Sequence, residues 1–287
     1  MPVVISMINL KGGVGKTTLT VALAEFMVLQ HGLKVLVIDL DPQTNATISL
    51  MSEQAWKKQN IKGQTIVRLF RDYLENMQIF SVSEAIVHNV SNIGGGIPGL
   101  DLIPSSLDLI DIQDELIKIP TRGIFSQRPL SVLGETICEE INDYDIVLID
   151  CPPNLGLITQ NGLMLSQYYL IPVIPDVLST YGIPQIVTRI NRLQAETGVP
   201  IEPLGVVVNH FRKQNSQHQI RVKVLELEAD EIGYRRVFST IVPHASRAAN
   251  AMDYSLPVKS LHEKYDYEVP YKPYQLLTEE VLSFVFS

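Results

Sequence analysis

Short apolar runs alternate along the chain with longer stretches in which apolar residues recur at helical spacing. The runs of strand length are Val3 to Ile8, Val35 to Ile38, Leu100 to Ile103, Ile146 to Ile149, Tyr169 to Val173 and Leu204 to Val208. The stretches with helical spacing are Thr17 to Gln30, Leu130 to Ile141, Thr159 to Ser166, Ile183 to Ala195 and Ser216 to Glu231. Strands that alternate with helices predict an α/β fold in which helices cover both faces of a parallel sheet.

The remaining segments are read from weaker patterns. We interpret residues 52 to 98, which a glycine-rich loop at Gly94 to Gly96 closes, as a helical insertion. A C-terminal helix is predicted at about residues 273 to 286. No linker rich in proline, glycine or serine divides the chain, so we expect a single domain over residues 1–287.

Composition narrows the class of protein. The 287 residues are 46% hydrophobic and 19% charged, which is typical of a globular chain with a large core. A net charge of −8 argues against a surface that is basic all over, although a local basic face remains open. Cys138 and Cys151 form no CxxC pair and the histidines show no metal-ligand spacing, so we expect a reduced cytoplasmic protein.

A glycine-rich segment follows the first apolar run. Gly12, Gly13 and Gly15 lie between that run and a helix predicted to begin near Lys16. Glycines let backbone N–H groups at a helix N-terminus approach an anion closely, and phosphate is the natural ligand. The Lys16 ammonium suits the β- and γ-phosphates of a nucleotide, and the Thr17 hydroxyl suits Mg²⁺.

Two other interpretations of this segment stay open. A dinucleotide fingerprint would use Gly13 and Gly15 but has Thr18 where its third glycine belongs. The segment would otherwise be a glycine-rich turn that binds nothing. The standard P-loop pattern is not met either, because Leu10 stands where it requires glycine.

The sequence from Lys11 to Thr18, KGGVGKTT, matches the deviant Walker A motif, and here the chain resembles the ParA/MinD family of ATPases. Four further segments are similar to that family. They are DLDPQTNAT from Asp39, DIVLIDCPP from Asp145, VVVN ending at Asn209, and TIVP from Thr240 with Arg247 after it. The resemblance implies a single-domain P-loop fold whose mainly parallel, twisted sheet has helices on both faces.

The family resemblance also implies roles for these residues. It implies a slow, Mg²⁺-dependent ATPase in which Asp41 orients or deprotonates the attacking water. Thr17, Asp39 and Asp150 would hold Mg²⁺, and Asn209 would read adenine. The residues implied to bind ATP are Lys11, Gly12, Gly13, Val14, Gly15, Lys16, Thr17, Thr18 and Asn209.

Lys11 is the residue that implies a dimer. In the family that this chain resembles, the corresponding lysine contacts the nucleotide of the other subunit, as an arginine finger does. The resemblance therefore implies an ATP-dependent homodimer with two nucleotides at its interface, in which Lys11 and Lys16 both serve catalysis.

The late part of the chain is locally basic. Between Val207 and Asn250 there are seven basic and four acidic residues, although a solvated charged face would look the same. Arg247, and more weakly Arg221, correspond to positions that imply binding of nonspecific double-stranded DNA. His244 stands where many relatives have a basic residue. Because the chain begins at its first strand, we expect no N-terminal helix-turn-helix domain.

The resemblance implies a cargo and an adaptor as well. A ParB-like or McdB-like partner would stimulate hydrolysis, and the protein would position a plasmid, chromosome or carboxysome over the nucleoid. A membrane partner is not expected, because the tail from Tyr274 to Ser287 has two glutamates and no basic residue. Three alternatives stay open: a MinD-like membrane-associated ATPase, a metal-cluster carrier or reductase, and an inactive protein that binds ATP without hydrolysing it.

Overall fold

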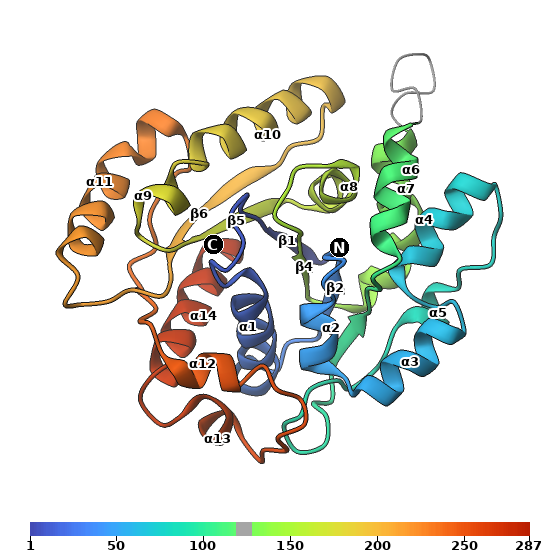
Figure 1. Cartoon of the computed structure of the whole chain (residues 1–287), viewed down its shortest axis with the longest axis horizontal. Helices are drawn as coiled ribbons and strands as arrows, with labels where there is room; N and C mark the ends of the chain where they lie inside the picture. Colours follow the sequence, from blue (N-terminus) through green and yellow to red (C-terminus); the bar gives the residue numbers. More distant parts are fainter. Residues whose placement is uncertain (119–127) are drawn as a thin grey trace.

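Six parallel strands form the centre of the computed structural model, which describes residues 1–118 and 128–287 (Figure 1). Their order in the sheet is β3-β2-β4-β1-β5-β6. The strands are β1 Val3–Met7, β2 Val35–Asp39, β3 Leu100–Ile103, β4 Ile146–Asp150, β5 Tyr168–Val173 and β6 Glu202–Val208. Each coincides with one of the apolar runs, so the predicted parallel sheet is confirmed.

Helices connect the strands. In the described ranges they are α1 Lys16–His31, α2 Asn45–Leu50, α3 Glu53–Ile61, α4 Ile66–Glu75, α5 Val82–Ala85, α6 Leu109–Ile117, α7 Arg128–Ile137, the 3₁₀ helix Glu140–Asp143, α8 Leu157–Leu165, α9 Val177–Thr180, α10 Ile183–Thr197, α11 Ser216–Ile232, α12 Ser246–Asn250, α13 Leu261–Tyr265 and α14 Tyr271–Val285. The five stretches predicted from helical spacing correspond to α1, α7, α8, α10 and α11. The short helices α2, α9, α12 and α13 were not predicted, because each is too brief to show a helical period.

Each face of the sheet packs against its own group of helices. Successive strand residues point to opposite faces, so Val4 joins one apolar core while Ile5 joins the other. The first core includes residues of α4, α6, α8, α10 and α11, and the second is filled by α1 and α14. Helices therefore cover both faces, as the alternation of strands and helices predicted.

The C-terminal helix α14 packs on the body of the protein. It lies beside α1 (Figure 1). Its buried face includes Tyr274 and Leu277, and the Tyr274 ring lies 6.4 Å from that of Phe26 in α1. Within the described ranges, no helix combines the length and apolar character needed to cross a membrane.

Residues 52–98 contain three helices and a stretch without helix. Helices α3, α4 and α5 occupy the first part, and after Ala85 the chain runs beside β3. Val87 pairs with Leu102 in an antiparallel bridge, and the Val90 N–H donates to the Leu100 carbonyl over 2.8 Å. These bonds cover the N–H and C=O groups of an edge strand, which would otherwise be free to pair with another chain.

Candidate nucleotide site

The glycine-rich loop leaves the carboxyl end of β1 and enters α1, as the sequence predicted. Gly13 and Gly15 adopt left-handed backbone conformations with φ of 76° and 88°. Two features exclude a side chain at Gly15. Its positive φ is unfavourable for any other residue, and a Cβ there would overlap Nδ2 of Asn209. The loop conformation therefore needs glycine at position 15.

Asn209, the residue after β6, supports the phosphate loop with a hydrogen bond. Its Nδ2 donates to the Val14 carbonyl over 2.9 Å, and its Oδ1 accepts the His210 N–H over 2.9 Å. The side chain is 1% exposed, and both ends of its amide are engaged with the protein. Its predicted role in reading adenine stays a prediction.

Two buried carboxylates lie at the ends of neighbouring strands. Asp39 ends β2 and Asp150 ends β4, and the strand register places the two residues opposite each other. The Thr17 hydroxyl donates to Asp150 Oδ2 over 2.7 Å. Burial raises the pKa of both carboxyls above the ordinary value, and the charge of Asp150 raises the pKa of Asp39 further.

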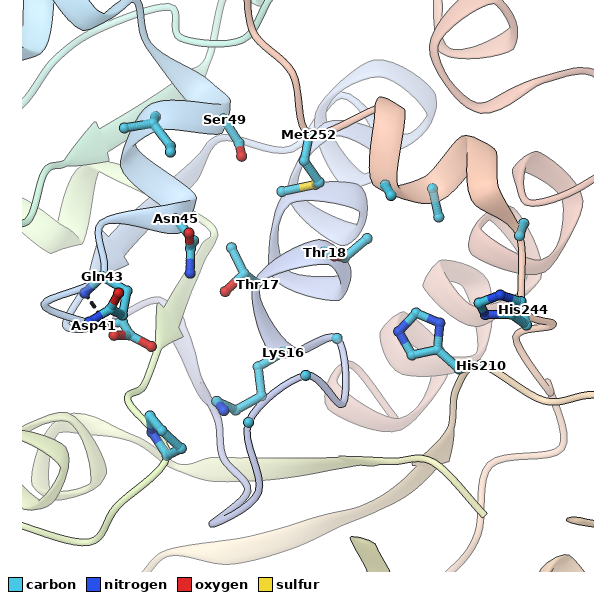
Figure 2. Close-up of a pocket in the computed structure, with 18 of the residues that line it drawn as sticks. Lys16, Thr17, Thr18, Asp41, Gln43, Asn45, Ser49, His210, His244 and Met252 are labelled. Carbon is cyan, nitrogen blue, oxygen red and sulfur yellow. Dashed lines mark hydrogen bonds between the residues drawn. The ribbon is translucent and has the colours of Figure 1, made fainter. Parts of the chain in front are cut away.

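These three residues fit a divalent cation of the kind that the family resemblance implies. Thr17, Asp39 and Asp150 present hard oxygen atoms, which Mg²⁺ prefers. Lys16 lowers the pKa of Asp150 by its charge, and its side chain extends toward the side of the cavity where Asp41 lies (Figure 2). Negative charge crowded at this point is what a bound cation would neutralise.

Thr47 is a residue of the site that sequence analysis missed. Asp39 Oδ2 accepts from the Thr47 N–H over 2.9 Å and from its hydroxyl over 2.7 Å, while Asp39 Oδ1 accepts the Asp41 N–H over 3.0 Å. The Thr47 hydroxyl also accepts the Ser105 N–H over 2.9 Å. Thr47 stands in the segment that resembles the family, but no pattern marks a side chain that reaches eight residues back to its partner.

Asp41 and the phosphate loop face a cavity of about 550 Å³, which is the size of a small-molecule site (Figure 2). Lys16, Thr17 and Asp41 line its phosphate end. The opposite side consists of His210, after β6, and of residues 244–252, among them His244 and Met252. Sequence analysis did not assign these residues to the cavity, because nothing local marks a wall built by distant segments.

Lys11 lies beside the loop rather than in the cavity. Its Nζ is 3.2 Å from Oδ2 and 3.3 Å from Oδ1 of Asp176, the N-cap residue of α9. The two side chains are 33% and 35% exposed. The pair was not predicted, and the expected contact of Lys11 with a partner subunit stays a prediction.

The two arginines expected to contact DNA are not among the described residues that line the nucleotide cavity. Arg221 in α11 is half-buried, and its Nε donates to the Thr180 hydroxyl over 2.6 Å. Arg247 in α12 is exposed, and its guanidinium donates to the Glu263 carbonyl. Of the two, only Arg247 stands free enough of the fold to meet a large partner.

A family model described as an AAA domain matches residues 3–202, which contain the phosphate loop and the predicted metal ligands. The chain belongs to the AAA domain family. Among curated relatives, the chromosome-partitioning ATPase Soj of Treponema pallidum is 27% identical, over 96% of this chain and 95% of its own length. This likeness places the chain with the ParA/Soj-type members of the AAA domain family.

Solved structures share the fold of this AAA domain protein. Cobyrinic acid a,c-diamide synthase from Mycobacterium smegmatis, with bound ATP analog and magnesium, is 23% identical with a TM-score of 0.74, covering 100% of this chain and 96% of that one. A variant of Cyanothece McdA in complex with ATP is 21% identical with a TM-score of 0.72, covering 98% of this chain and 96% of that one. At this identity the two structures bear on the fold alone.

Proposed function

We propose that this ParA/Soj-type protein is a slow, Mg²⁺-dependent ATPase that dimerises around two ATP molecules. One observation carries the proposal: a Gly-Lys-Thr loop meets two buried aspartates where β1, β2 and β4 end, beside a cavity of about 550 Å³. Lys16 and the loop N–H groups supply positive charge for a triphosphate. Two proteins that share this fold have solved structures with ATP, or with an ATP analog and magnesium, which shows that the fold can hold such a ligand.

In this proposal, each side chain has a separate task in phosphoryl transfer. Thr17, Asp39 and Asp150 hold Mg²⁺, which neutralises charge on the phosphate oxygens. Asp41 orients the attacking water from the cavity wall that it lines. Lys16 stabilises the negative charge that develops on the transferred group.

Dimerisation needs Lys11 to leave its own chain. An ion pair as exposed as that of Lys11 with Asp176 is worth only about 0–1 kcal/mol, so a triphosphate on a partner subunit can outcompete it. The phosphates of bound ATP neutralise Lys16 of one subunit and Lys11 of the other, which would otherwise repel each other across the interface. ATP would therefore drive the association of two subunits.

The dimer would bind nonspecific duplex DNA and carry a cargo over the nucleoid. Exposed Arg247 and the excess of basic residues between Val207 and Asn250 support contact with the phosphate backbone. A ParB-like or McdB-like adaptor on the cargo would stimulate hydrolysis and release the DNA. The cargo is a plasmid, a chromosome or a carboxysome, in keeping with the partitioning ATPase and the McdA protein among the relatives.

Light scattering and phosphate release test the proposal together. With ATP and Mg²⁺ the parent should double in mass, and Asp41→Ala should form the same dimer but release phosphate about 100-fold more slowly. Lys11→Ala should bind ATP and stay monomeric, while Lys58→Ala, which changes an exposed lysine in α3, should behave as the parent does. Rapid turnover by Asp41→Ala would show that Asp41 does not orient the attacking water. A normal dimer of Lys11→Ala would show that Lys11 does not bridge the two subunits.

A further inference from the structure

A second cavity, of about 430 Å³, opens beside the nucleotide cavity. The two cavities share Gly13 of the phosphate loop and the rings of His210 and His244. Arg212 and His218 belong to the second cavity only. Nothing in the proposed ATPase chemistry uses this space.

The second cavity is lined by one carboxylate and four groups that carry or can accept positive charge. Asp176 is the only carboxylate among the described residues that line it. Both Asp176 oxygens face Lys11 Nζ, and Oδ1 also accepts the Ser179 N–H over 2.6 Å. In the chain as described this carboxylate is paired with Lys11, and no second carboxylate faces the remaining groups among the described residues that line the cavity.

The hydrogen bonds already present leave donors available in this cavity. The Arg212 N–H donates to His218 Nδ1 over 3.2 Å, so a neutral His218 carries its proton on Nε2. The Arg212 guanidinium, which only donates, lies 3.4 Å from His244 Nε2, so a neutral His244 carries its proton on Nδ1. Each ring therefore keeps one N–H that no described residue accepts.

His210, His244 and Arg212 lie close together in the second cavity, and this makes a positive charge on the His210 ring unfavourable. Burial lowers the pKa of His210, and the neighbouring His244 and Arg212 lower it further. The rings of His210 and His244 lie 5.6 Å apart. A ligand with several negative oxygens would relieve this crowding and accept the free N–H groups, which is the chemistry of a phosphate group.

The second cavity opens onto a basic surface. Arg212 and His244, which line the cavity, are exposed, and so are Lys213, the next residue after Arg212, and Arg247 in α12. A single small anion would use the cavity but not this surface. A polymer that presents phosphates at regular spacing would use both.

We infer that the second cavity binds a backbone phosphate of duplex DNA through Arg212, His218 and His244. This inference rests on the proposed DNA binding and assigns to it residues that the sequence did not single out. Because His210 and His244 line both cavities, a nucleotide and a DNA phosphate would lie against the same two side chains. DNA binding is thereby sensitive to the occupant of the nucleotide cavity.

A phosphate in this place makes DNA binding depend on pH. Protonation of His210, whose pKa is lowered by burial and by the neighbouring His244 and Arg212, adds positive charge to a cavity in which Asp176 is the one carboxylate among the described lining residues. Phosphate favours the charged His210 ring, so affinity for DNA rises as the pH falls through the range in which His210 takes up its proton. Each proton taken up on binding changes the affinity by at most about tenfold per pH unit.

The test compares Arg212→Gln with Arg212→Lys and with Arg192→Gln, a matched control on α10 whose arginine pairs with Glu196. Retention on a duplex of random sequence is measured with ATP and Mg²⁺ over a range of salt and pH, and ATP affinity is measured separately. Arg212→Gln should weaken DNA binding about tenfold and leave ATP affinity unchanged. The slope of the logarithm of the DNA-binding constant against the logarithm of salt concentration should become less steep by about 0.9 for each phosphate contact that is lost. Arg212→Lys should keep most of the binding.

The outcomes are distinct. Parent-like DNA binding by Arg212→Gln overturns the inference and leaves the proposed function standing. If Arg212→Gln loses ATP affinity as much as DNA affinity, the cavity belongs to the nucleotide. If a few millimolar inorganic phosphate binds in the cavity of the parent while Arg212→Gln binds DNA as the parent does, the cavity belongs to the free anion. Either result overturns the inference. If the parent itself shows no ATP-dependent retention, the proposed DNA binding fails first and the inference fails with it.

Discussion

The phosphate end of the nucleotide cavity comes from residues at the ends of β1, β2 and β4, whereas the opposite wall comes from residues 244–252, near the other end of the chain. The phosphate end is fixed by the sheet, since Asp39 and Asp150 stand opposite each other in its register. The C-terminal wall begins beside β6, where the Val242 N–H donates to the Val208 carbonyl and the His244 N–H to the Phe211 carbonyl, but its residues form no strand and α12 spans only Ser246–Asn250. One region is thus built into the sheet, and the other is attached beside it by its first residues.

A buried ion pair anchors the chain that follows this wall. Lys264 Nζ lies 2.6 Å from Glu25 Oε1, with side-chain exposures of 1% and 0%. Glu25 also accepts from the Tyr265 and Ser91 hydroxyls, each over 2.6 Å. The pair joins the middle of α1 to α13, so the helix that carries the phosphate loop also fixes the chain that follows the C-terminal wall.

The largest effect is expected from Lys264→Met, which leaves the Glu25 carboxylate buried without its cation. Loss of one partner of a buried pair destabilises a fold by about 3–5 kcal/mol. We expect a fall of that size in the free energy of unfolding, measured by denaturant titration, whereas Lys259→Met at an exposed position should leave it unchanged.

The same variant separates the two regions of the cavity. Well below its melting temperature, Lys264→Met should lose affinity for ATP, which needs both regions, and keep affinity for tripolyphosphate, which needs only the phosphate end. Equal losses for both ligands would show that the wall and the loop are not independent.

Lys16→Ala tests the phosphate end of the cavity directly, whereas Lys264→Met acts on the C-terminal wall. Removal of one preorganised positive group at the site of developing charge slows catalysis by about 10²–10³-fold. We expect that loss in phosphate release, together with an unchanged circular dichroism spectrum, because the Lys16 side chain faces the cavity. Lys62→Ala, beyond the end of α3, is the control. A variant that retained a tenth of the parent rate would place the main positive charge elsewhere.

A smaller effect is expected at Thr47, the residue that links Asp39 to Ser105. In Thr47→Val, the Ser105 N–H and one Asp39 oxygen each lose a partner inside the protein, at an expected loss of about 1–3 kcal/mol in unfolding free energy. Thr136→Val is matched to it, because the Thr136 hydroxyl donates only to a carbonyl of its own helix, that of Val132. Equal destabilisation by the two variants would mean that Thr47 has no special role.

The contrast between the two regions also explains what the sequence could predict. The places of the phosphate loop, Asp39 and Asp150 were predictable, because each follows or ends an apolar run, whereas their roles came from the family resemblance and stay predictions. Glu25 and Lys264 are 239 residues apart, and Asp176 is 165 residues from Lys11, so no local pattern relates these partners. The C-terminal wall could not be predicted for the same reason, since its contacts with Phe211 after β6 and with the core around α1 join residues that are distant in the sequence.

The smallest effect is expected from Asp176→Asn, which removes the charge that holds Lys11 to its own chain. Asparagine can still cap α9 by accepting the Ser179 N–H, so the change isolates the ion pair. An ion pair this exposed contributes about 0–1 kcal/mol. We therefore expect unchanged unfolding and a fall of up to about fivefold in the ATP concentration that half-saturates dimer formation, followed by light scattering. A rise in that concentration would instead mean that Asp176 supports the dimer, and that Lys11 needs the carboxylate even when it faces a second subunit.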